Sequence, residues 1–175
     1  MKSPIKRFAL WLQPDRYAER ISDIKPGELA EKGIGAVILD LDNTFLPWKS
    51  DTVPEENLAW AASMKQNGVK LFVLSNTTKP ARMKGICSLI GAGWLHPAAK
   101  PGKKSFMRAS ELLGLEPGRI AVAGDQLFTD MLGGRLAGMY AILVRPMSRR
   151  EFFGTRYISR PAERFLRRYM DAPFK

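Results

Sequence analysis

The chain has 175 residues, of which 45% are hydrophobic and 26% are charged, so it can form a folded core, and intrinsic disorder is excluded as its main state. Its 28 lysines and arginines outnumber 17 acidic residues, and the net charge of +11 favours an anionic partner: nucleic acid, an acidic membrane surface or a phosphorylated substrate. The single cysteine, Cys87, excludes an intramolecular disulfide, and no cysteine and histidine cluster has the spacing of a zinc site.

The first 32 residues form an amphipathic flank of mixed charge. Its apolar residues lie beside basic ones: Phe8, Leu10, Trp11 and Leu12 accompany Lys2, Lys6 and Arg7. Such a segment would suit an anchor at a membrane interface, and the alternative is a solvated helix packed on the domain. The apolar part is too short for a signal peptide.

Short apolar runs alternate with segments of helical spacing in the middle of the chain. The runs span residues 35–41, 69–74, 92–95, 120–123 and 139–144, and the predicted helices span about 28–32, 54–67, 79–90, 102–113 and 128–136. Continuous apolar strands that alternate with helices indicate a parallel sheet covered on both faces. We therefore predict an α/β, doubly wound parallel sheet in a single domain over residues 1–175, with its core at about 30–146.

A basic amphipathic extension follows the core over about residues 147–175. Residues 145–175 carry an excess of six positive charges, and Pro161 suits the first turn of a final helix. Helical spacing places arginines on one face and apolar residues on the other: Arg160, Arg164, Arg167 and Arg168 against Ala162, Phe165, Leu166 and Tyr169. Like the N-terminal flank, this helix could contact an anionic membrane or pack on the domain.

No stretch approaches the roughly 18 consecutive apolar residues of a transmembrane helix. We therefore expect a cytoplasmic protein without a transmembrane segment, which could contact the inner face of a membrane peripherally.

Polar side chains suited to phosphate chemistry follow four successive apolar runs. In chain order they are Asp40, Asp42 and Thr44, then Ser75 and Asn76, then Lys100, and finally Asp125 and Asp130. Ligands of this fold class bind beyond the carboxyl ends of the strands, so these groups are expected to converge. Each motif alone could be an ordinary turn or helix cap, but the four in order favour a functional site.

The spacing of the acidic residues predicts a metal site. Asp40 and Asp42 are two residues apart, so in an extended chain their side chains leave on the same side. A hard divalent cation, with Mg²⁺ as the first choice, would relieve their repulsion, and Asp125 and Asp130 could add oxygen ligands. With hydrogen bonds from Thr44 and the charge of Lys100, this is a site for a phosphoryl group.

The strings DLDNT, LSNTT, AKPGKKSF and GDQLFTD resemble the four motifs of the haloacid dehalogenase superfamily of phosphatases. Over about residues 12–168 the chain more specifically resembles YqeG-type, subfamily IIIA phosphatases, which are similar to phosphatidylglycerophosphate phosphatases. The resemblance implies that Asp40 is the nucleophile, Asp42 the general acid and base, and Lys100 the residue that steadies the phosphoryl group.

The remaining roles also come from the resemblance. Ser75 and Asn76 would bind the phosphoryl oxygens. Asp125 would hold Mg²⁺ with Asp40 and the backbone carbonyl of Asp42, and Asp130 would support the metal or Lys100.

The gaps between the motifs leave no room for a cap domain, so we predict an open site. An open site suits a phosphate on a large carrier, and with the basic flanks and the resemblance it favours phosphatidylglycerophosphate at a membrane surface. Two alternatives stay open: the same chemistry on a soluble or nucleic-acid phosphate, and a non-enzymatic basic adaptor for RNA or ribosomes. Intact motifs argue against the adaptor, and nucleic acid is the less favoured partner. The oligomeric state is not predicted.

Overall fold

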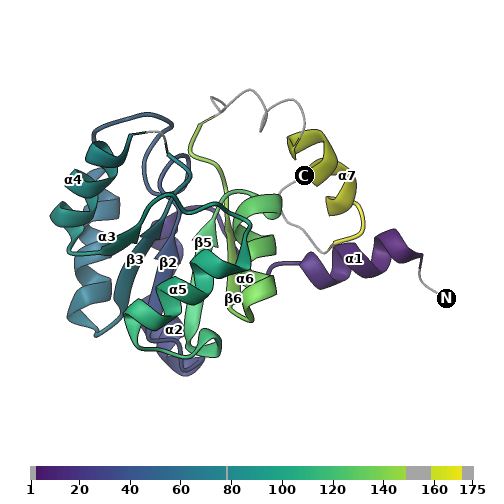
Figure 1. Ribbon diagram of the computed structural model, residues 1–175, viewed down its shortest axis with the longest axis horizontal. Helices are drawn as coiled ribbons and strands as arrows, with labels where there is room; N and C mark the ends of the chain where they lie inside the picture. Colours follow the sequence, from purple (N-terminus) through teal and green to yellow (C-terminus); the bar gives the residue numbers. More distant parts are fainter. Residues whose placement is uncertain (1–2, 78, 149–158, 171–175) are drawn as a thin grey trace.

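A six-stranded, fully parallel sheet forms the centre of the protein, in the order β1-β6-β5-β2-β3-β4 (Figure 1). The computed structural model describes residues 3–77, 79–148 and 159–170. The strands are β1 (Arg16–Ala18), β2 (Ala36–Leu39), β3 (Lys70–Leu74), β4 (Gly93–Leu95), β5 (Ile120–Gly124) and β6 (Tyr140–Val144). The predicted α/β fold with a parallel sheet is confirmed.

Helices connect the strands and flank the sheet. They are α1 (Pro4–Leu12), α2 (Pro26–Glu31), α3 (Glu55–Gln66), α4 (Pro80–Ile90), α5 (Lys103–Leu113), α6 (Leu132–Ala137) and α7 (Arg160–Arg167). Short 3₁₀ turns lie at Ile21–Asp23 and Pro117–Arg119, and a π turn at Leu127–Met131 leads into α6. Gly114 ends α5 in the left-handed conformation (φ 65°) that glycine adopts without strain, as its place after the helix predicts.

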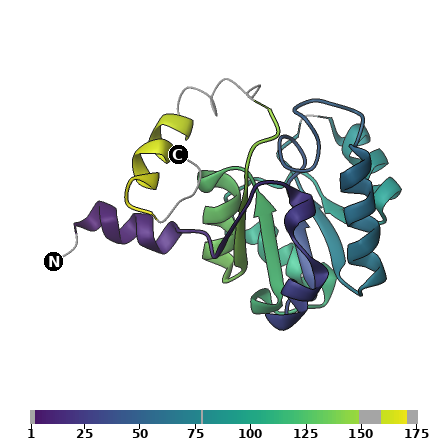
Figure 2. The same cartoon turned by 180° about the vertical axis from the view of Figure 1, so that it is seen from behind.

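The central strands bury side chains on both faces of the sheet. Along β2, Val37 and Leu39 belong to one apolar cluster, whereas Ala36 and Ile38 belong to the other, as the alternation of a strand requires. Helices α3 and α4 contribute to the first cluster and α5 and α6 to the second (Figures 1 and 2). Burial on both faces explains why these strands are continuous apolar runs.

Strand β1 lies at one edge of the sheet, outside the predicted core of about residues 30–146. It pairs with β6 in parallel, and the neighbouring Asp15 accepts a hydrogen bond from the Ala141 N–H at 2.8 Å. A three-residue strand that contains an arginine has no apolar run by which the sequence could reveal it. The sheet therefore begins about fifteen residues before the predicted boundary.

The two flanking helices pack against each other and on the second apolar cluster. Ala9 and Leu12 of α1 and Leu166 of α7 are buried there, so Leu12 is a core residue and not part of an exposed anchor. Figure 2 shows α1 and α7 side by side, beyond the edge of the sheet. Phe8 and Trp11 remain exposed, at 41% and 46% of their surface.

The predicted faces of the final helix are wrong in part. Arg160 and Arg167 turn toward the protein, where the buried carboxylate of Glu163 lies 2.9 Å and 3.9 Å from their guanidinium groups, whereas Phe165 is exposed. A buried carboxylate needs cationic partners, and this requirement overrides the simple amphipathic pattern. The described residues do not include Lys2 of the N-terminal flank, nor residues 149–158 and 171–175 of the basic extension.

None of the helices in the described ranges combines the length and the apolar character that crossing a bilayer requires.

Candidate active site

The polar residues predicted from the sequence meet where the order of the strands reverses. Strands β2 and β5 are neighbours, but the chain leaves β2 toward β3 and β4 and then returns to β5 on the other side. Ligands of open α/β sheets bind beyond the carboxyl ends of the strands at such a point. Asp40 directly follows β2 and Asp125 directly follows β5, so both carboxylates lie at this place.

A cavity of about 490 Å³ opens at the carboxyl ends of the strands. Its lining includes Asp40, Asp42, Ser75, Asn76 and Lys100. In the described part of the chain, only α3 lies between β2 and β3 and only α4 between β3 and β4, so neither connection carries an inserted cap. The predicted open site agrees with this topology.

Three buried carboxylates converge beside the cavity, and the part of the cavity that Asp40 and Lys100 line next to them is termed its inner side. Oxygen atoms of Asp40, Asp125 and Asp130 all lie within 4.8 Å of one another. The Lys100 Nζ atom donates to Asp40 at 2.6 Å and to Asp130 at 2.7 Å and thereby joins two of them. Asp130 also accepts a hydrogen bond from the Gln126 backbone N–H at 3.2 Å.

The backbone of β5 approaches Asp130 closely. A Cβ atom on Gly124 would lie 2.3 Å from the Asp130 Cγ atom, a distance that side chains do not tolerate. Glycine at this position is therefore required for Asp130 to reach Lys100, and the π turn after Gln126 brings the carboxylate back over the end of the strand.

Burial shifts the pKa values of the acidic cluster and of the lysine that it contacts. Burial raises the pKa of Asp40 to about 7, against the opposing effect of Lys100, and raises that of Asp125 to about 8, against the opposing effect of Arg160. Burial lowers the pKa of Lys100, but the carboxylates of Asp130 and Asp40 outweigh it, and the pKa lies above its ordinary value. All the donors are carboxylate oxygens, a set that fits a hard divalent cation.

Of the neutral residues of the predicted site, some line the cavity and one supports a carboxylate behind it. Ser75 and Asn76 line the cavity, and the Asn76 amide also exchanges two hydrogen bonds with the Lys100 backbone, at 3.0 and 3.2 Å. Thr44 is completely buried, and its hydroxyl donates to the Asp125 carboxylate at 3.3 Å. This contact orients Asp125, whereas binding of substrate by Thr44 stays a prediction.

Asp42 lines the same cavity as Asp40 but has different partners. Its two carboxylate oxygens accept hydrogen bonds from the Arg82 guanidinium at 3.0 and 3.2 Å, and one of them also accepts the Lys49 N–H at 2.8 Å. The chain turns sharply after Leu41, with Asn43 in the left-handed region (φ 68°). Asp42 is not one of the three clustered carboxylates, and the part of the cavity that it lines with Lys49, Lys79 and Arg82 is termed the outer side.

Sequence reasoning missed two arginines of the site. Arg82, on the first turn of α4, pairs with Asp42, and Arg160, at the start of α7, donates to the Asp125 backbone carbonyl at 2.7 Å and pairs with its carboxylate. Glu163 holds Arg160 and accepts the Leu127 N–H at 2.9 Å. Arg82 lies 40 residues from Asp42 and Arg160 lies 35 residues from Asp125, and no local pattern links either pair.

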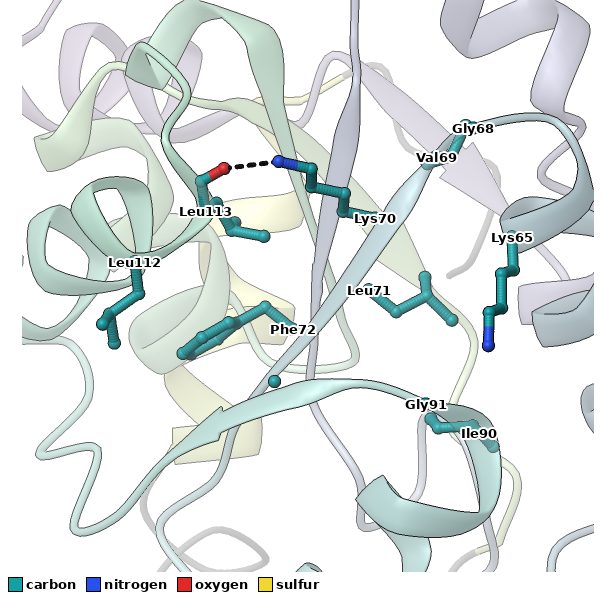
Figure 3. Close-up of a pocket in the computed structure, with 11 residues that line it drawn as sticks. Lys65, Gly68, Val69, Lys70, Leu71, Phe72, Ile90, Gly91, Leu112 and Leu113 are labelled. Carbon is teal, nitrogen blue, oxygen red and sulfur yellow. Dashed lines mark hydrogen bonds between the residues drawn. The ribbon is translucent and has the colours of Figure 1, made fainter.

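A second cavity, of about 400 Å³, lies beside the first half of β3 (Figure 3). Apolar side chains and Lys65 and Lys70 line it, and the Lys70 ammonium donates to the Leu113 carbonyl at 2.8 Å. None of the described residues lining it carries a carboxylate, and it adjoins the strand's opposite end from the acidic cluster. The chemistry therefore belongs to the first cavity.

Comparison with known proteins agrees with this geometry. A family model described as HAD-hydrolase-like matches residues 97–150. The chain is 35% identical over 160 residues to "Probable phosphatase YqeG" of Bacillus subtilis (strain 168), covering 91% of this chain and 90% of that protein.

Solved structures share the fold. An uncharacterized protein from Listeria monocytogenes serotype 4b superposes with a TM-score of 0.52 at 18% identity, covering 77% of this chain and 99% of that one. An uncharacterized protein from Corynebacterium glutamicum gives a TM-score of 0.52 at 18% identity, with 76% and 94% covered. On its sequence relationship, and with a fold and an acidic cluster that agree, the chain belongs to the haloacid-dehalogenase-like (HAD-like) phosphatase family.

Proposed function

We propose that this protein is a Mg²⁺-dependent phosphomonoesterase of the YqeG-type, subfamily IIIA group that converts phosphatidylglycerophosphate to phosphatidylglycerol at a membrane surface. The observation that carries the phosphatase chemistry is the Asp40 carboxylate, which lies 2.6 Å from Lys100 within a cluster of three buried carboxylates at an uncapped cavity. Asp40 and Asp125, with Asp130 beside them, would hold Mg²⁺, which when bound supplies positive charge to neutralise phosphoryl oxygens.

The side chains of the site can carry out the reaction in two steps. In the first, an Asp40 carboxylate oxygen attacks phosphorus, the bond from phosphorus to the lipid oxygen breaks, and Asp42 in its protonated form gives its proton to that oxygen. In the second, Asp42 takes a proton from water, the water oxygen attacks phosphorus, and the bond to Asp40 breaks to release inorganic phosphate. Lys100 holds Asp40 in place and offsets charge on the phosphoryl group.

Exposed apolar residues beside basic ones support a membrane-bound substrate. Phe8 and Trp11 on α1 are exposed next to Lys6 and Arg7, and their rings lie 5.9 Å apart. On α7, Phe165 is 44% exposed between Arg164 and the helix end. Aromatic and basic side chains together suit the interface of an anionic bilayer. Because α7 begins at Arg160, which contacts Asp125, the helix that carries Phe165 is attached to the acidic cluster.

The decisive experiment is phosphate release from phosphatidylglycerophosphate in mixed micelles with Mg²⁺, compared with EDTA and with the Asp40→Asn variant. We expect turnover that both controls abolish. Turnover of an aryl phosphate without turnover of the lipid would keep the phosphatase and reject the lipid, in favour of a soluble or nucleic-acid phosphate. RNA binding that survives loss of Asp40 and Asp125, without turnover of any substrate, would instead indicate an adaptor.

The membrane contact has its own test. We expect the partition coefficient onto anionic vesicles to fall about 10³-fold in the double variant Phe8→Ser, Trp11→Ser, because each of the two aromatic side chains contributes about 2 kcal/mol when it is buried in the interface. Leu89→Ser is the matched control, since Leu89 is 64% exposed on α4. Equal loss in both variants would reject α1 as the membrane contact.

A further inference from the structure

The outer side of the cavity is rich in cations. Lys49, Lys79 and Arg82 all line it, and the Lys49 ammonium lies 4.3 Å from the centre of the Trp48 ring, which lines it as well. Asp42 is the one acidic residue among the lining residues on this side, and Asp51, 3.3 Å from the Arg82 Nε atom, has a side chain that is 80% exposed. The outer side thus has more basic than acidic lining residues, whereas the inner side adjoins three carboxylates, two of which Lys100 joins.

Arg82 is buried and presents two parallel donors. Its side chain is 7% exposed, and its two Nη atoms lie 3.0 and 3.2 Å from the two oxygens of Asp42. A guanidinium in this arrangement binds any planar or tetrahedral oxyanion with two hydrogen bonds, and such pairs are stronger than neutral ones. The Asp42 carboxylate thus occupies a position that fits an anionic group of a ligand.

The contacts of Asp42 conflict with its proposed role. A general acid and base must have an oxygen available to the leaving oxygen, which lies beside Asp40 during the reaction. In the structure, both Asp42 oxygens accept hydrogen bonds from Arg82, and one also accepts the Lys49 N–H. The pairing with Arg82 therefore competes with this role, and an anion that takes the place of Asp42 on Arg82 would release it.

We propose that Arg82, with Lys79 and Lys49, forms a second anion subsite. This subsite binds a negatively charged group of the leaving alcohol, which is either a phosphodiester or a carboxylate, and Asp42 occupies it until the substrate arrives. The inference rests on the proposed phosphatase and names the class of its substrate: a phosphomonoester whose alcohol carries a further negative charge. A phosphodiester of a lipid headgroup and an anionic group of a soluble molecule satisfy it equally.

The test compares substrates that differ in the second anion alone. Glycerol 3-phosphate and 3-phosphoglycerate share a carbon skeleton and differ by a hydroxymethyl group against a carboxylate, and deacylated phosphatidylglycerophosphate presents the phosphodiester without acyl chains. We expect kcat/KM for both doubly anionic substrates to exceed that for glycerol 3-phosphate by about tenfold or more, the effect of one pair of charge-assisted hydrogen bonds.

The variants assign that preference to residues. Lys79→Gln should reduce the ratio of kcat/KM values about threefold and Arg82→Gln should reduce it to near one, whereas Lys84→Gln, an exposed lysine of the same helix, should leave it unchanged. Arg82 also donates to the Ser50 carbonyl at 2.8 Å, so its loss could disturb the fold, and Lys79→Gln keeps the test valid in that case. A ratio near one in the wild type, or an unchanged ratio in both variants, would overturn the proposal.

Two further comparisons separate the possible failures. Preference for the intact lipid without preference for its deacylated form would assign the effect to the membrane surface and reject the subsite. If no phosphomonoester is turned over, the proposed function fails, and calorimetry then tests the subsite alone. We expect both doubly anionic compounds to bind the Asp40→Asn variant more tightly than glycerol 3-phosphate does. Equal Kd values for the three compounds would reject the subsite.

Discussion

The inner and outer sides of the cavity are built from different kinds of structure. The inner side takes its side chains from strand ends and the turn after β5, and Asp40, Asp125 and Asp130 there are at most 8% exposed. The outer side takes Asp42 and Lys49 from a loop and Arg82 from the start of a helix. The end of the sheet therefore positions the proposed reaction centre, whereas a loop and the first turn of a helix form the side that would face the leaving alcohol of the substrate.

The largest expected effect is on the inner side. Asp40→Asn should lower kcat by about 10³-fold or more, because an amide cannot replace a carboxylate as the attacking group. Phosphate release from an aryl phosphate measures it, with the thermal unfolding temperature as the control for folding. Activity within tenfold of the wild type would mean that the inner side is not the reaction centre.

In the absence of metal, Lys100 should contribute more to the unfolding free energy than any other residue of the inner side. Lys100→Met leaves the buried carboxylates of Asp40 and Asp130 without their shared cation, so we expect a loss of about 4 kcal/mol in unfolding free energy in EDTA. Urea unfolding measures it. The matched control is Lys70→Met, which removes one hydrogen bond to a backbone carbonyl and should cost about 1 kcal/mol. Equal losses would mean that Lys100 does not stabilise the buried carboxylates of the inner side.

Close packing of the inner side gives a smaller effect. Gly124→Ala places a methyl group against the Asp130 carboxylate, which Lys100 and the Gln126 N–H hold in place, so we expect a loss of about 2 kcal/mol. Gly118→Ala is the control, since a Cβ atom there meets nothing within 4 Å. If Gly124→Ala unfolds at the same urea concentration as the wild type, Asp130 is not rigidly held.

The inner side was also the more predictable from sequence. Asp40 and Asp125 directly follow apolar runs, and topology brings the ends of parallel strands to one edge, so their convergence follows from local pattern alone. Arg82 and Arg160 could not be assigned in this way, because their partners lie 35 to 40 residues away and nothing local marks the pairing.

The edge strand β1 and the inward face of α7 were not predicted from the sequence, for related reasons. Strand β1 has three residues and depends on β6 for its conformation, so it carries no apolar run. The inward face of α7 depends on the buried Glu163, which selects Arg160 and Arg167 as partners, and helical periodicity does not reveal that preference. The buried centre follows from periodicity, whereas ion pairs and edges depend on tertiary contacts.

The smallest expected effect is the gain in Tm that Mg²⁺ provides, and this gain should depend on pH. Burial raises the pKa of Asp125 to about 8 and that of Asp40 to about 7, from 3.8. A carboxyl whose pKa is higher in the folded state binds its proton more tightly there, so its contribution is fully present below about pH 4 and is lost as the pH rises toward 8. In EDTA, these two groups should therefore lower stability over that window.

Bound Mg²⁺ favours the ionised carboxylates and should oppose this loss, so the gain in Tm from EDTA to Mg²⁺ should grow from near zero at about pH 5 to about 3 °C at about pH 8. The difference between the two curves cancels titration elsewhere in the chain. Asp125→Asn should flatten the difference because it removes a group with a raised pKa and replaces a charged carboxylate ligand with a neutral amide oxygen. A gain in Tm independent of pH would mean that the cation binds outside the inner side, and it would remove the electrostatic contrast between the two sides of the cavity.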